Sequence, residues 1–232
     1  MSSPVSYQLD ESVATVTLDD GKVNALSPAM QNDINAALDR TVEDGAKAVV
    51  LAGNAKVFSG GFDLSVFASG DAQATLAMLA GGFELSLRCL TFPVPVVMAA
   101  TGPAIAMGSF LLLSADHRVG SPRSRCQANE VAIGMTLPIA AIEIMRMRLT
   151  HAAFQRAISM AATFAGDAAI AAGWLDEIVE SEAVLARAQQ VAAEAAATLN
   201  AGAHVGSKLK ARAAAILAVR AGIDGLPTEF AG

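Results

Sequence analysis

The stretch Val57-Phe58-Ser59-Gly60-Gly61-Phe62-Asp63-Leu64 follows an apolar run, Ala48 to Ala52, that is typical of a buried strand. Its two glycines leave the backbone free, because glycine adopts positive φ at no steric cost and lets the main chain approach a ligand closely. Such a loop can point its N–H groups into a pocket and hold an anion there. The alternative is an ordinary strand-to-helix connection, since paired glycines are common in turns. A second glycine turn, near Gly108, favours the interpretation that the loop forms part of a ligand-binding pocket.

The composition favours a large core built from aliphatic side chains. Of the 232 residues, 53% are hydrophobic, 16% are charged and 5% are aromatic, which suits closely packed helices and parallel strands. The formal net charge is −6 and the chain has no Lys/Arg cluster, which argues against nucleic acid or an anionic membrane surface as a partner. Cys89 and Cys126 lie far apart in an apolar chain, so we expect both to be reduced core residues of a cytoplasmic protein.

Neither a signal peptide nor a membrane span is expected. The segment from Met1 to Glu11 lacks the positive and apolar regions of a signal peptide. The uncharged stretch from Cys89 to Ala115 is longer than the ~20 residues that a spanning helix needs. Its prolines and glycines instead favour a short strand (Val94 to Ala100), a turn and an apolar helix (Met107 to Ala115).

Hydrophobic periodicity predicts alternating strands and helices. In the first half of the chain we expect strands at Val13 to Leu18, Ala48 to Ala52 and Val94 to Ala100, and helices from Ser27-Pro28 to about Arg40, from Asp71 to Leu90 and from Met107 to Ala115. In the second half we expect an extended piece at Ser124 to Ala128, helices at Leu137 to Arg148, Ala152 to Phe164 and Ala168 to Ala172, a strand at Trp174 to Val179, and two Ala-rich helices between Glu182 and Ala221. This alternation is typical of a largely parallel sheet covered by helices, an α/β fold.

The second glycine turn, Thr101-Gly102-Pro103-Ala104-Ile105-Ala106-Met107-Gly108, opens the apolar helix. The N–H groups at a helix N-terminus are unpaired and carry partial positive charge, so they can hold an oxyanion. If the strands that end near Leu51 and Ala100 lie side by side, one N–H from each glycine turn can contact a single oxygen. Two such donors stabilise negative charge on a carbonyl oxygen by roughly 3 kcal/mol each.

Five motifs, in matching order and spacing, make the chain resemble the enoyl-CoA hydratase/isomerase family (the crotonase superfamily) from about Val5 onward. They are Asn24-Ala25-Leu26-Ser27, Phe58 to Leu64, the turn with Gly102, Ala104 and Gly108 followed by Leu111 and Asp116, the segment with Asn129-Glu130, Gly134 and Pro138, and Ala172 to Asp176. The resemblance implies an acyl-CoA-binding, crotonase-like spiral of ββα units in residues 1–181. It also implies that residues 182–232 form a helical trimerisation region, with trimers that often pair into hexamers.

The resemblance also implies roles for single residues. The N–H groups of Phe62 and Met107 become the oxyanion donors for the thioester carbonyl, since any residue except proline supplies a main-chain donor. Glu130 becomes a general base with a pKa raised by apolar neighbours such as Val131 and Ile133; the alternative is a solvated residue at a helix entry. Acyl-CoA is the substrate, and neither a cofactor nor a metal is implied. The remaining contacts to acyl-CoA are assigned to Lys22, Val23, Ala25, Ser59, Gly60, Gly61, Asp63, Gly108 and Phe110.

Structural roles are expected for Asp116 and the histidines, and for Asp63 in addition to its contact with acyl-CoA. Asp63 and Asp116 match family positions, and each can cap a backbone N–H near its turn. The three histidines are scattered without metal-ligand spacing. A basic residue near the end of the chain, Lys208 or Lys210, either reaches a CoA phosphate or lies on a solvated helix face.

Departures from the family pattern favour one reaction over the others. Family hydratases place a glutamate two residues after the glycine turn and a second one in a later Pro-Glu segment, whereas here the first position is Phe110 and Glu130 alone remains. The glycine-rich continuation after Pro138 is also missing, so the pocket is less able to hold a polarised water. One base can still move a proton from C2 to C4 of an enolate. Double-bond isomerisation of enoyl-CoA is therefore favoured over 2-enoyl-CoA hydration, as in fatty acid β-oxidation, over acyl-CoA hydrolysis and over catalytically silent acyl-CoA binding.

Overall fold

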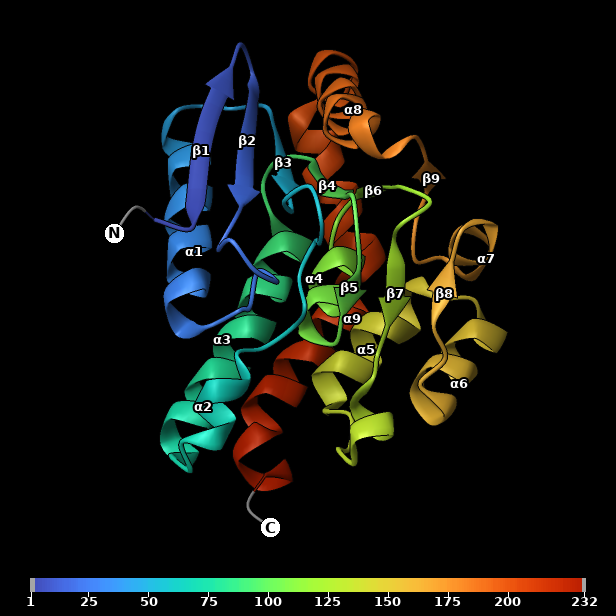
Figure 1. Cartoon of the computed structure of the whole chain (residues 1–232). Coiled ribbons are helices and arrows are strands. Elements are labelled where there is room, and N and C mark those ends of the chain that lie inside the picture. The colour runs from blue at the N-terminus through green and yellow to red at the C-terminus, as the bar shows by residue number, and fades with distance from the viewer. Residues whose placement is uncertain (1–2, 231–232) are drawn as a thin grey trace.

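A six-stranded sheet forms the centre of the molecule (Figure 1), in a computed structural model that describes residues 3–230. The β1–β2 pair is antiparallel and the other pairs are parallel. In spatial order the strands are β1 (Val5–Asp10), β2 (Val13–Leu18), β3 (Ala48–Ala52), β4 (Val96–Ala100), β6 (His117–Gly120) and β9 (Glu177–Ile178). A smaller sheet contains β5 (Ala104–Ile105), β7 (Arg125–Gln127) and β8 (Phe164–Ala165). Every residue of β3 and β4 is buried, as expected for parallel strands covered on both faces.

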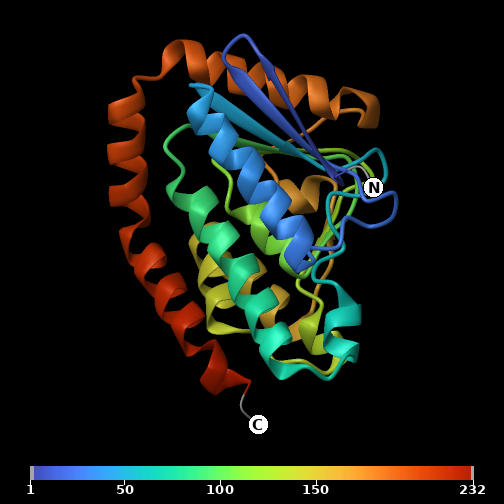
Figure 2. The ribbon, with the colours of Figure 1, turned by 90° about the vertical axis from the view of Figure 1, so that its left-hand side faces the viewer.

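Helices cover both sides of the large sheet (Figure 2). α1 (Pro28–Glu43) and α3 (Ala72–Thr91) lie on one side, and α8 (Val184–Thr198) crosses the other. α9 (Ala201–Glu229) runs along the edge of the molecule against α3 and α5 (Ile139–Arg148). The shorter helices are α2 (Leu64–Ala68), α4 (Met107–Leu113), α6 (His151–Met160) and α7 (Asp167–Ala172), with 3₁₀ turns η1 (Glu130–Ile133) and η2 (Ser181–Ala183).

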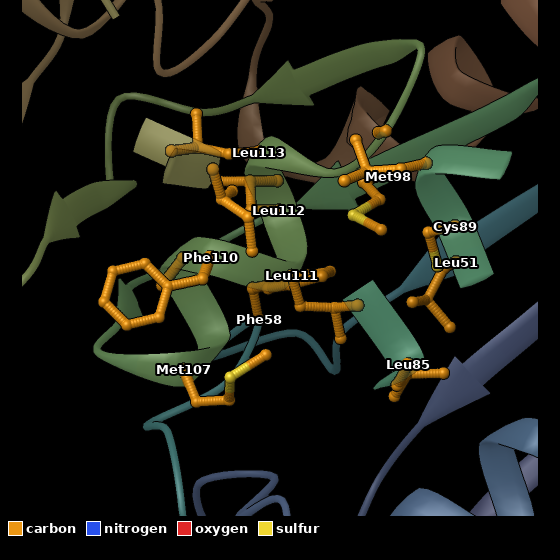
Figure 3. Close-up of a cluster of buried hydrophobic side chains, with 14 of the residues drawn as sticks. Leu51, Phe58, Leu85, Cys89, Met98, Met107, Phe110, Leu111, Leu112 and Leu113 are labelled. Atoms are coloured by element: carbon orange, nitrogen blue, oxygen red, sulfur yellow. The ribbon is translucent and has the colours of Figure 1, made fainter. Parts of the chain in front are cut away.

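The period-two alternation of the strands divides the interior into two cores. Along β3, Val49 and Leu51 belong to the larger core, whereas Val50 packs in the smaller core with Ala188 and Ala192 of α8. The small side chains of α8 let that helix lie close to the sheet. Figure 3 shows the larger core extending from Leu51 and Met98 to Met107 and Phe110 at the start of α4. The turn that opens α4 therefore rests directly on the core.

Local signals predicted several element boundaries correctly, but the helix expected at Ala152 to Phe164 ends at Met160, because Ala161 adopts a left-handed conformation (φ +46°), and Phe164 lies in β8. The strands expected at 13–18 and 48–52 have the observed bounds. The Ser27 hydroxyl caps α1 by accepting from Met30 N at 3.2 Å, and the Asp71 carboxylate caps α3 by accepting from Ala74 N at 2.9 Å. Side-chain caps satisfy N–H groups that the first helical turn leaves unpaired, so they fix where each helix begins.

The elements that were not predicted include β1, α2 and β6, besides the two-residue strands β5 and β8 and the 3₁₀ turns η1 and η2. β1 is an edge strand with mostly exposed residues, and α2 has only five residues, none of them buried, so neither carries a hydrophobic period. β6 contains His117 and Arg118, two side chains that argue against a buried strand. Arg118 is 3% exposed and makes hydrogen bonds with the Asp176 carboxylate at 2.8 Å. A partner distant in the sequence thus makes this strand possible.

The predicted C-terminal region, residues 182–232, packs on its own chain over its described part. α8 contacts β2, β3, β4 and β6, and α9 contacts α3 and α5. α9 begins after Asn200, whose side chain accepts from Ala203 N at 3.0 Å, and Gly202 and Gly206 lie inside the helix. Residues 1–2 and 231–232 of the two predicted regions lie outside the described residues. The role of 182–232 in self-association stays a prediction.

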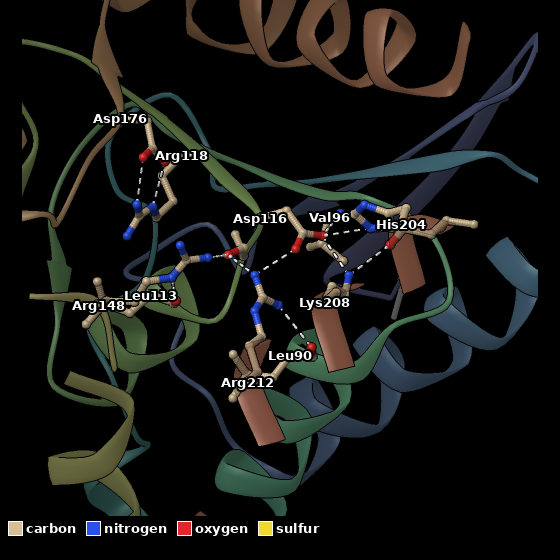
Figure 4. Close-up of polar contacts among 12 residues, drawn as sticks. Leu90, Val96, Leu113, Asp116, Arg118, Arg148, Asp176, His204, Lys208 and Arg212 are labelled. Carbon is tan, nitrogen blue, oxygen red and sulfur yellow. Dashed lines mark hydrogen bonds and ion pairs between the residues drawn. The ribbon is translucent and has the colours of Figure 1, made fainter. Parts of the chain in front are cut away.

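A buried ionic cluster ties α9 to the sheet (Figure 4). The Asp116 carboxylate accepts from Lys208 Nζ and from Arg212 Nη2, both at 2.7 Å, and also from the backbone N–H of Val96 at 2.8 Å. The expectation that Asp116 caps a backbone N–H is therefore confirmed. The expectation for Lys208 is wrong, because its side chain is 3% exposed and ion-paired and so lies on no solvated face. Lys210 is exposed.

Both cysteines are free and buried, as predicted. Burial in apolar surroundings raises the pKa of each thiol to about 12, so neither is a ready nucleophile at neutral pH.

Over residues 3–230, no helix combines the length and the apolar character needed to cross a membrane.

Candidate active site

The two glycine turns lie side by side, as the sequence predicts. Their parent strands β3 and β4 are neighbours in the sheet, with Leu51 opposite Met98. Beyond the strands the turns stay hydrogen-bonded: Phe58 N donates to Pro103 O at 2.9 Å, and Ile105 N donates to Ser59 O at 3.0 Å. The two backbones therefore run next to each other up to the start of α4.

Glycine allows the close approach of the two turns. Gly61 has φ +98°, and a Cβ there would lie 3.0 Å from Ile105 O and 3.5 Å from Met107 N. A Cβ on Gly108 would lie only 2.5 Å from Ser59 O. Main-chain atoms of each turn thus contact the other turn where side chains would otherwise separate them.

The N–H groups of Phe62 and Met107 are available at this contact. Phe62 directly follows Gly61, and Met107 is the first residue of α4, where an N–H has no acceptor within the helix. Within residues 3–230, neither N–H donates a hydrogen bond to a protein acceptor. Two unpaired donors on adjoining turns can hold one oxyanion. Their assignment as the oxyanion donors is consistent with this placement and stays a prediction.

A cavity of about 190 Å³ lies next to the turns. Phe62 contacts Phe83 edge to face, with ring centroids 6.2 Å apart, and Phe83 stacks on Phe110 at 6.2 Å. Of the described residues that line the cavity, only Asn129 and Glu130 have polar side chains, so it suits an apolar group. The lining residues are Gly60, Phe62, Leu64, Phe67, Leu79, Phe83, Ala106, Phe110, Asn129, Glu130, Ile133, Met135, Pro138 and Phe230.

Glu130 places a carboxyl group in this apolar cavity. It begins η1, which ends at Gly134 with φ +82°, and Met135 N donates to Glu130 O at 2.9 Å to close the turn. The residue is 7% exposed, and its Oε2 atom is buried with no hydrogen-bond partner among the described residues. Desolvation raises the pKa of Glu130 to about 7. The raised pKa is in the predicted direction, and the alternative of a solvated helix-entry residue is wrong.

The source of the desolvation differs from the expectation. Val131 and Ile133 are 46% and 56% exposed, and of these two only Ile133 lines the cavity. Most of the large apolar side chains in the cavity wall come from parts of the chain that are distant from Glu130 in the sequence: the first glycine turn, α2, α3, α4 and the end of the described chain. Neighbours along the chain therefore explain less of the raised pKa than segments that folding brings together.

The raised pKa predicts that ionisation of Glu130 weakens the fold. Because the folded-state pKa is about 7 and the ordinary value is 4.5, the stabilising contribution is complete below pH 4.5 and is lost as the pH rises through 7. The cost at pH 8 is of the order of 3 kcal/mol. Urea unfolding at pH 5 and pH 8 should show that Glu130→Gln removes most of this fall in unfolding free energy.

Glu43→Gln is the matched control for this pH dependence, because Glu43 is exposed at the end of α1. We expect it to keep the pH dependence of the unsubstituted protein. If Glu130→Gln and Glu43→Gln gave parallel curves, the carboxyl group of Glu130 would not carry a raised pKa.

Ala106, in the second glycine turn, adopts a strained backbone conformation. Its φ is +50° and its ψ is −126°, a region that favours glycine, and the resemblance of this turn to the family pattern places a glycine here. We expect Ala106→Gly to raise the unfolding free energy by about 1 kcal/mol. Thermal unfolding tests this, with Ala211→Gly on exposed helical backbone of α9 as a control that should lose about 1 kcal/mol. A lower melting temperature for Ala106→Gly would show that the turn is not strained.

The segments assigned to acyl-CoA lie together. Gly60 N donates to Val23 O and Leu26 N donates to Gly61 O, both at 2.8 Å, so residues 22–26 run along residues 59–63. Val23 is 53% exposed and Lys22 is exposed, and both lie on the outer side of this pair. The assigned set, Lys22, Val23, Ala25, Ser59, Gly60, Gly61, Asp63, Gly108 and Phe110, thus gathers around the turns and the cavity.

Two of the assigned residues serve the local structure. Asp63 caps α2, since its Oδ1 accepts from Ser65 N at 2.9 Å, as the expected structural role requires. Ser59 is buried, and its hydroxyl donates to Asn24 O at 2.8 Å. Sequence reasoning missed the role of Asn24, which has φ +52° and donates from its side chain to Leu18 O and Phe58 O. The signal that could have revealed it is the asparagine itself, at the start of the Asn24-Ala25-Leu26-Ser27 motif, because asparagine tolerates the left-handed backbone region in turns.

Several cavity residues were also missed. Leu79 and Phe83 lie four residues apart on α3, so helical periodicity could have placed both on one face. The adjacent Gly82 gives the Phe62 ring room, because a Cβ there would lie 2.5 Å from that ring. Phe230 comes from the far end of the chain, and no local pattern connects it to this cavity.

Comparisons with known proteins agree with the motifs. A family model described as enoyl-CoA hydratase/isomerase matches residues 8–223. Two solved structures of one Mycobacterium tuberculosis protein are similar over nearly the whole chain. One is called an enoyl-CoA isomerase (TM-score 0.96, 54% identity, 99% of this chain and 100% of that chain) and the other a probable enoyl-CoA hydratase, EchA3 (TM-score 0.97, 55% identity, 98% and 96%).

More distant relatives carry both names as well. A mitochondrial enoyl-CoA delta isomerase 1 from Mus musculus is 26% identical over 77% of this chain and 63% of its own. A probable enoyl-CoA hydratase from Bacillus subtilis is 27% identical over 56% of this chain and 52% of its own. The chain spans about half the length of the first curated relatives that it matches.

Proposed function

Because the chain belongs to the enoyl-CoA hydratase/isomerase family, we propose that it acts on enoyl-CoA thioesters and moves their double bond between the 3 and 2 positions. The observation that carries this proposal is the buried carboxyl group of Glu130, which among the described lining residues is the one carboxyl group in a cavity that is otherwise apolar apart from Asn129. Phe110 lines the same cavity at the position where family hydratases carry their first glutamate. One acid without a second carboxylate suits proton transfer better than the orientation of a water molecule.

The proposed reaction uses the two turns and Glu130 together. The thioester oxygen accepts hydrogen bonds from Phe62 N–H and Met107 N–H, and the Glu130 carboxylate removes a proton from C2 of a 3-enoyl-CoA. The electron pair of the broken C–H bond moves toward the thioester oxygen, where the two amides stabilise the negative charge. The protonated Glu130 then returns the proton to C4, and the double bond forms between C2 and C3. A pKa of about 7 suits a group that is base first and acid second.

Hydration of a 2-enoyl-CoA is the second candidate. Its support is that relatives with the same fold, including the 55% identical structure, are called hydratases. The same amide pair would stabilise the enolate formed when water adds to C3. The proposal ranks hydration second because Phe110 provides no acceptor to hold that water.

We also propose that acyl-CoA is the substrate with no separate cofactor, and that the cytoplasmic chain forms a homotrimer or hexamer through residues 182–232. Exposed apolar side chains on this region support self-association: Leu199, Leu209 and Leu217 are 47%, 38% and 71% exposed. Analytical ultracentrifugation of the purified chain tests the assembly.

The reaction is tested by supplying purified protein with 3-enoyl-CoA and, separately, 2-enoyl-CoA. Isomerisation produces the conjugated 2-enoyl-CoA from the first substrate, which ultraviolet absorbance detects. Hydration instead produces 3-hydroxyacyl-CoA from the second substrate, and hydrolysis releases free CoA thiol. We expect conjugated product as the main outcome, whereas no product from either substrate would contradict an enzymatic role on enoyl-CoA.

A further inference from the structure

The last turns of α9 are held firmly against the first turn of α5. At the crossing, Gly222 lets the two backbones touch, because a Cβ there would lie 2.6 Å from Ala140 N. Four residues later Leu226 is 1% exposed in the larger core. The end of α9 is therefore placed by packing on α5, in spite of Pro227 in its last turn.

Glu229 adds a directional bond to this packing. Its Oε2 accepts from Ile139 N at 3.2 Å, and Ile139 is the first residue of α5. The residue before it is Pro138, which gives α5 no side-chain cap of its own. A carboxylate from α9 thus satisfies an unpaired N–H and complements the positive end of the α5 dipole.

Phe230 follows Glu229 and forms part of the cavity wall. Its side chain is partly buried against the larger core and lines the same cavity as Glu130, Pro138 and Met135. Figure 1 shows the end of α9 at the bottom of the molecule, between α2 and the loop that precedes α5. The residue that follows the last turn of α9 thus forms part of the cavity wall.

We infer that Phe230 limits the length of the acyl chain that this cavity accepts, with Glu229 as the residue that holds it in position. This inference rests on the proposed function. The cavity of about 190 Å³ holds on the order of six groups of the ~30 Å³ that a water-sized group occupies. The substrate class is therefore an apolar enoyl group of short to medium length, since only Asn129 and Glu130 among the described residues of the wall have polar side chains.

The chain-length profile tests this inference. Catalytic efficiency (kcat/KM) for 3-enoyl-CoA substrates of 6, 8, 10, 12 and 16 carbons is measured with the whole protein and with three variants: Phe230→Ala, Phe230→Leu and Glu229→Ala. The matched control is Val42→Ala, which shortens a 52% exposed side chain of α1 outside the cavity wall. Dissociation constants for saturated acyl-CoAs of the same lengths provide a readout that needs no turnover, and melting temperatures verify folding.

We expect the substrate preference to move to longer acyl chains when a smaller side chain replaces Phe230. Phe230→Ala should raise the ratio of kcat/KM for the 12-carbon substrate to kcat/KM for the 6-carbon substrate by tenfold or more. One methylene group more or less in an apolar pocket changes kcat/KM by roughly 10–200-fold. Phe230→Leu should shift the ratio less, Glu229→Ala should broaden the range of chain lengths that are turned over, and Val42→Ala should leave the profile unchanged.

Other outcomes separate the two proposals. If the unsubstituted protein is active and Phe230→Ala and Phe230→Leu lower all chain lengths in parallel, Phe230 is core packing only and the inference is wrong. If the unsubstituted protein turns over none of the substrates, the proposed function fails, and the dissociation constants alone then decide whether Phe230 limits chain length. Should Phe230→Ala fail to fold, the Phe230→Leu profile decides in the same way.

Discussion

A Glu130→Gln variant is expected to isomerise enoyl-CoA roughly 10²–10⁴ times more slowly than the unsubstituted protein while binding acyl-CoA with similar affinity. Glutamine fills the same space as glutamate, so the cavity keeps its shape, but an amide cannot take the proton from C2 or return it to C4. The amides of Phe62 and Met107 belong to the main chain and remain in place. The loss should therefore fall on kcat and leave KM nearly unchanged.

The pH–rate profile adds a second test of the same residue. Because Glu130 must be ionised to act as a base and its pKa is about 7, kcat/KM of the unsubstituted protein should rise between pH 6 and pH 8. The residual activity of Glu130→Gln should not show this rise. Undiminished turnover by the variant, or an unchanged profile, would remove Glu130 from the mechanism. Glu43→Gln, exposed at the end of α1, is the control for a change of net charge.

The elements that sequence predicts well are those whose signal is local. β2 and β3 are periodic or wholly apolar over their full length, and Ser27 and Asp71 mark helix starts with caps that depend on three residues of sequence. β6 carries no such signal, because His117 and Arg118 are polar side chains. They fit this strand only because they pair with Glu177 and Asp176, which lie far away in the sequence. Contacts between residues distant in the sequence determine whether such strands form, and the periodicity of a single sequence carries no information about those contacts.

The residues of the candidate site also fall into two groups, those with a local sequence signal and those without one. Each glycine turn could be located from its own residues, and the adjacency of β3 and β4 then brought both turns together. The cavity wall instead collects residues from α2, α3, α4, η1 and the end of α9, and Phe230 has no local pattern that connects it to Glu130. The error for Lys208 has a similar origin, since a lysine becomes buried only where a partner such as Asp116 compensates its charge.

A Gly108→Ala variant is expected to lose roughly 10²–10³ in kcat, because it separates the two glycine turns. The added Cβ would lie 2.5 Å from Ser59 O and 2.9 Å from Ser59 C, and a backbone neighbour cannot move aside as a flexible side chain can. The turn with Ser59 and the start of α4 must therefore move apart. Since Phe62 lies three residues after Ser59 and Met107 directly before Gly108, their N–H groups can no longer contact one thioester oxygen. Overpacking should also cost about 1–3 kcal/mol of unfolding free energy.

The measurement must distinguish a distorted oxyanion site from simple unfolding. The matched control is Gly206→Ala, also within a helix, where an added Cβ meets nothing within 4 Å; it should keep full activity and gain up to about 1 kcal/mol. Activity is compared below the melting temperature of each variant, with the folded fraction measured by circular dichroism. If the activity of Gly108→Ala falls only in proportion to its folded fraction, the spacing of the two turns does not govern catalysis. A fall in kcat at full folding, with Glu130 unchanged, would instead mean that the paired amides stabilise the enolate independently of the base.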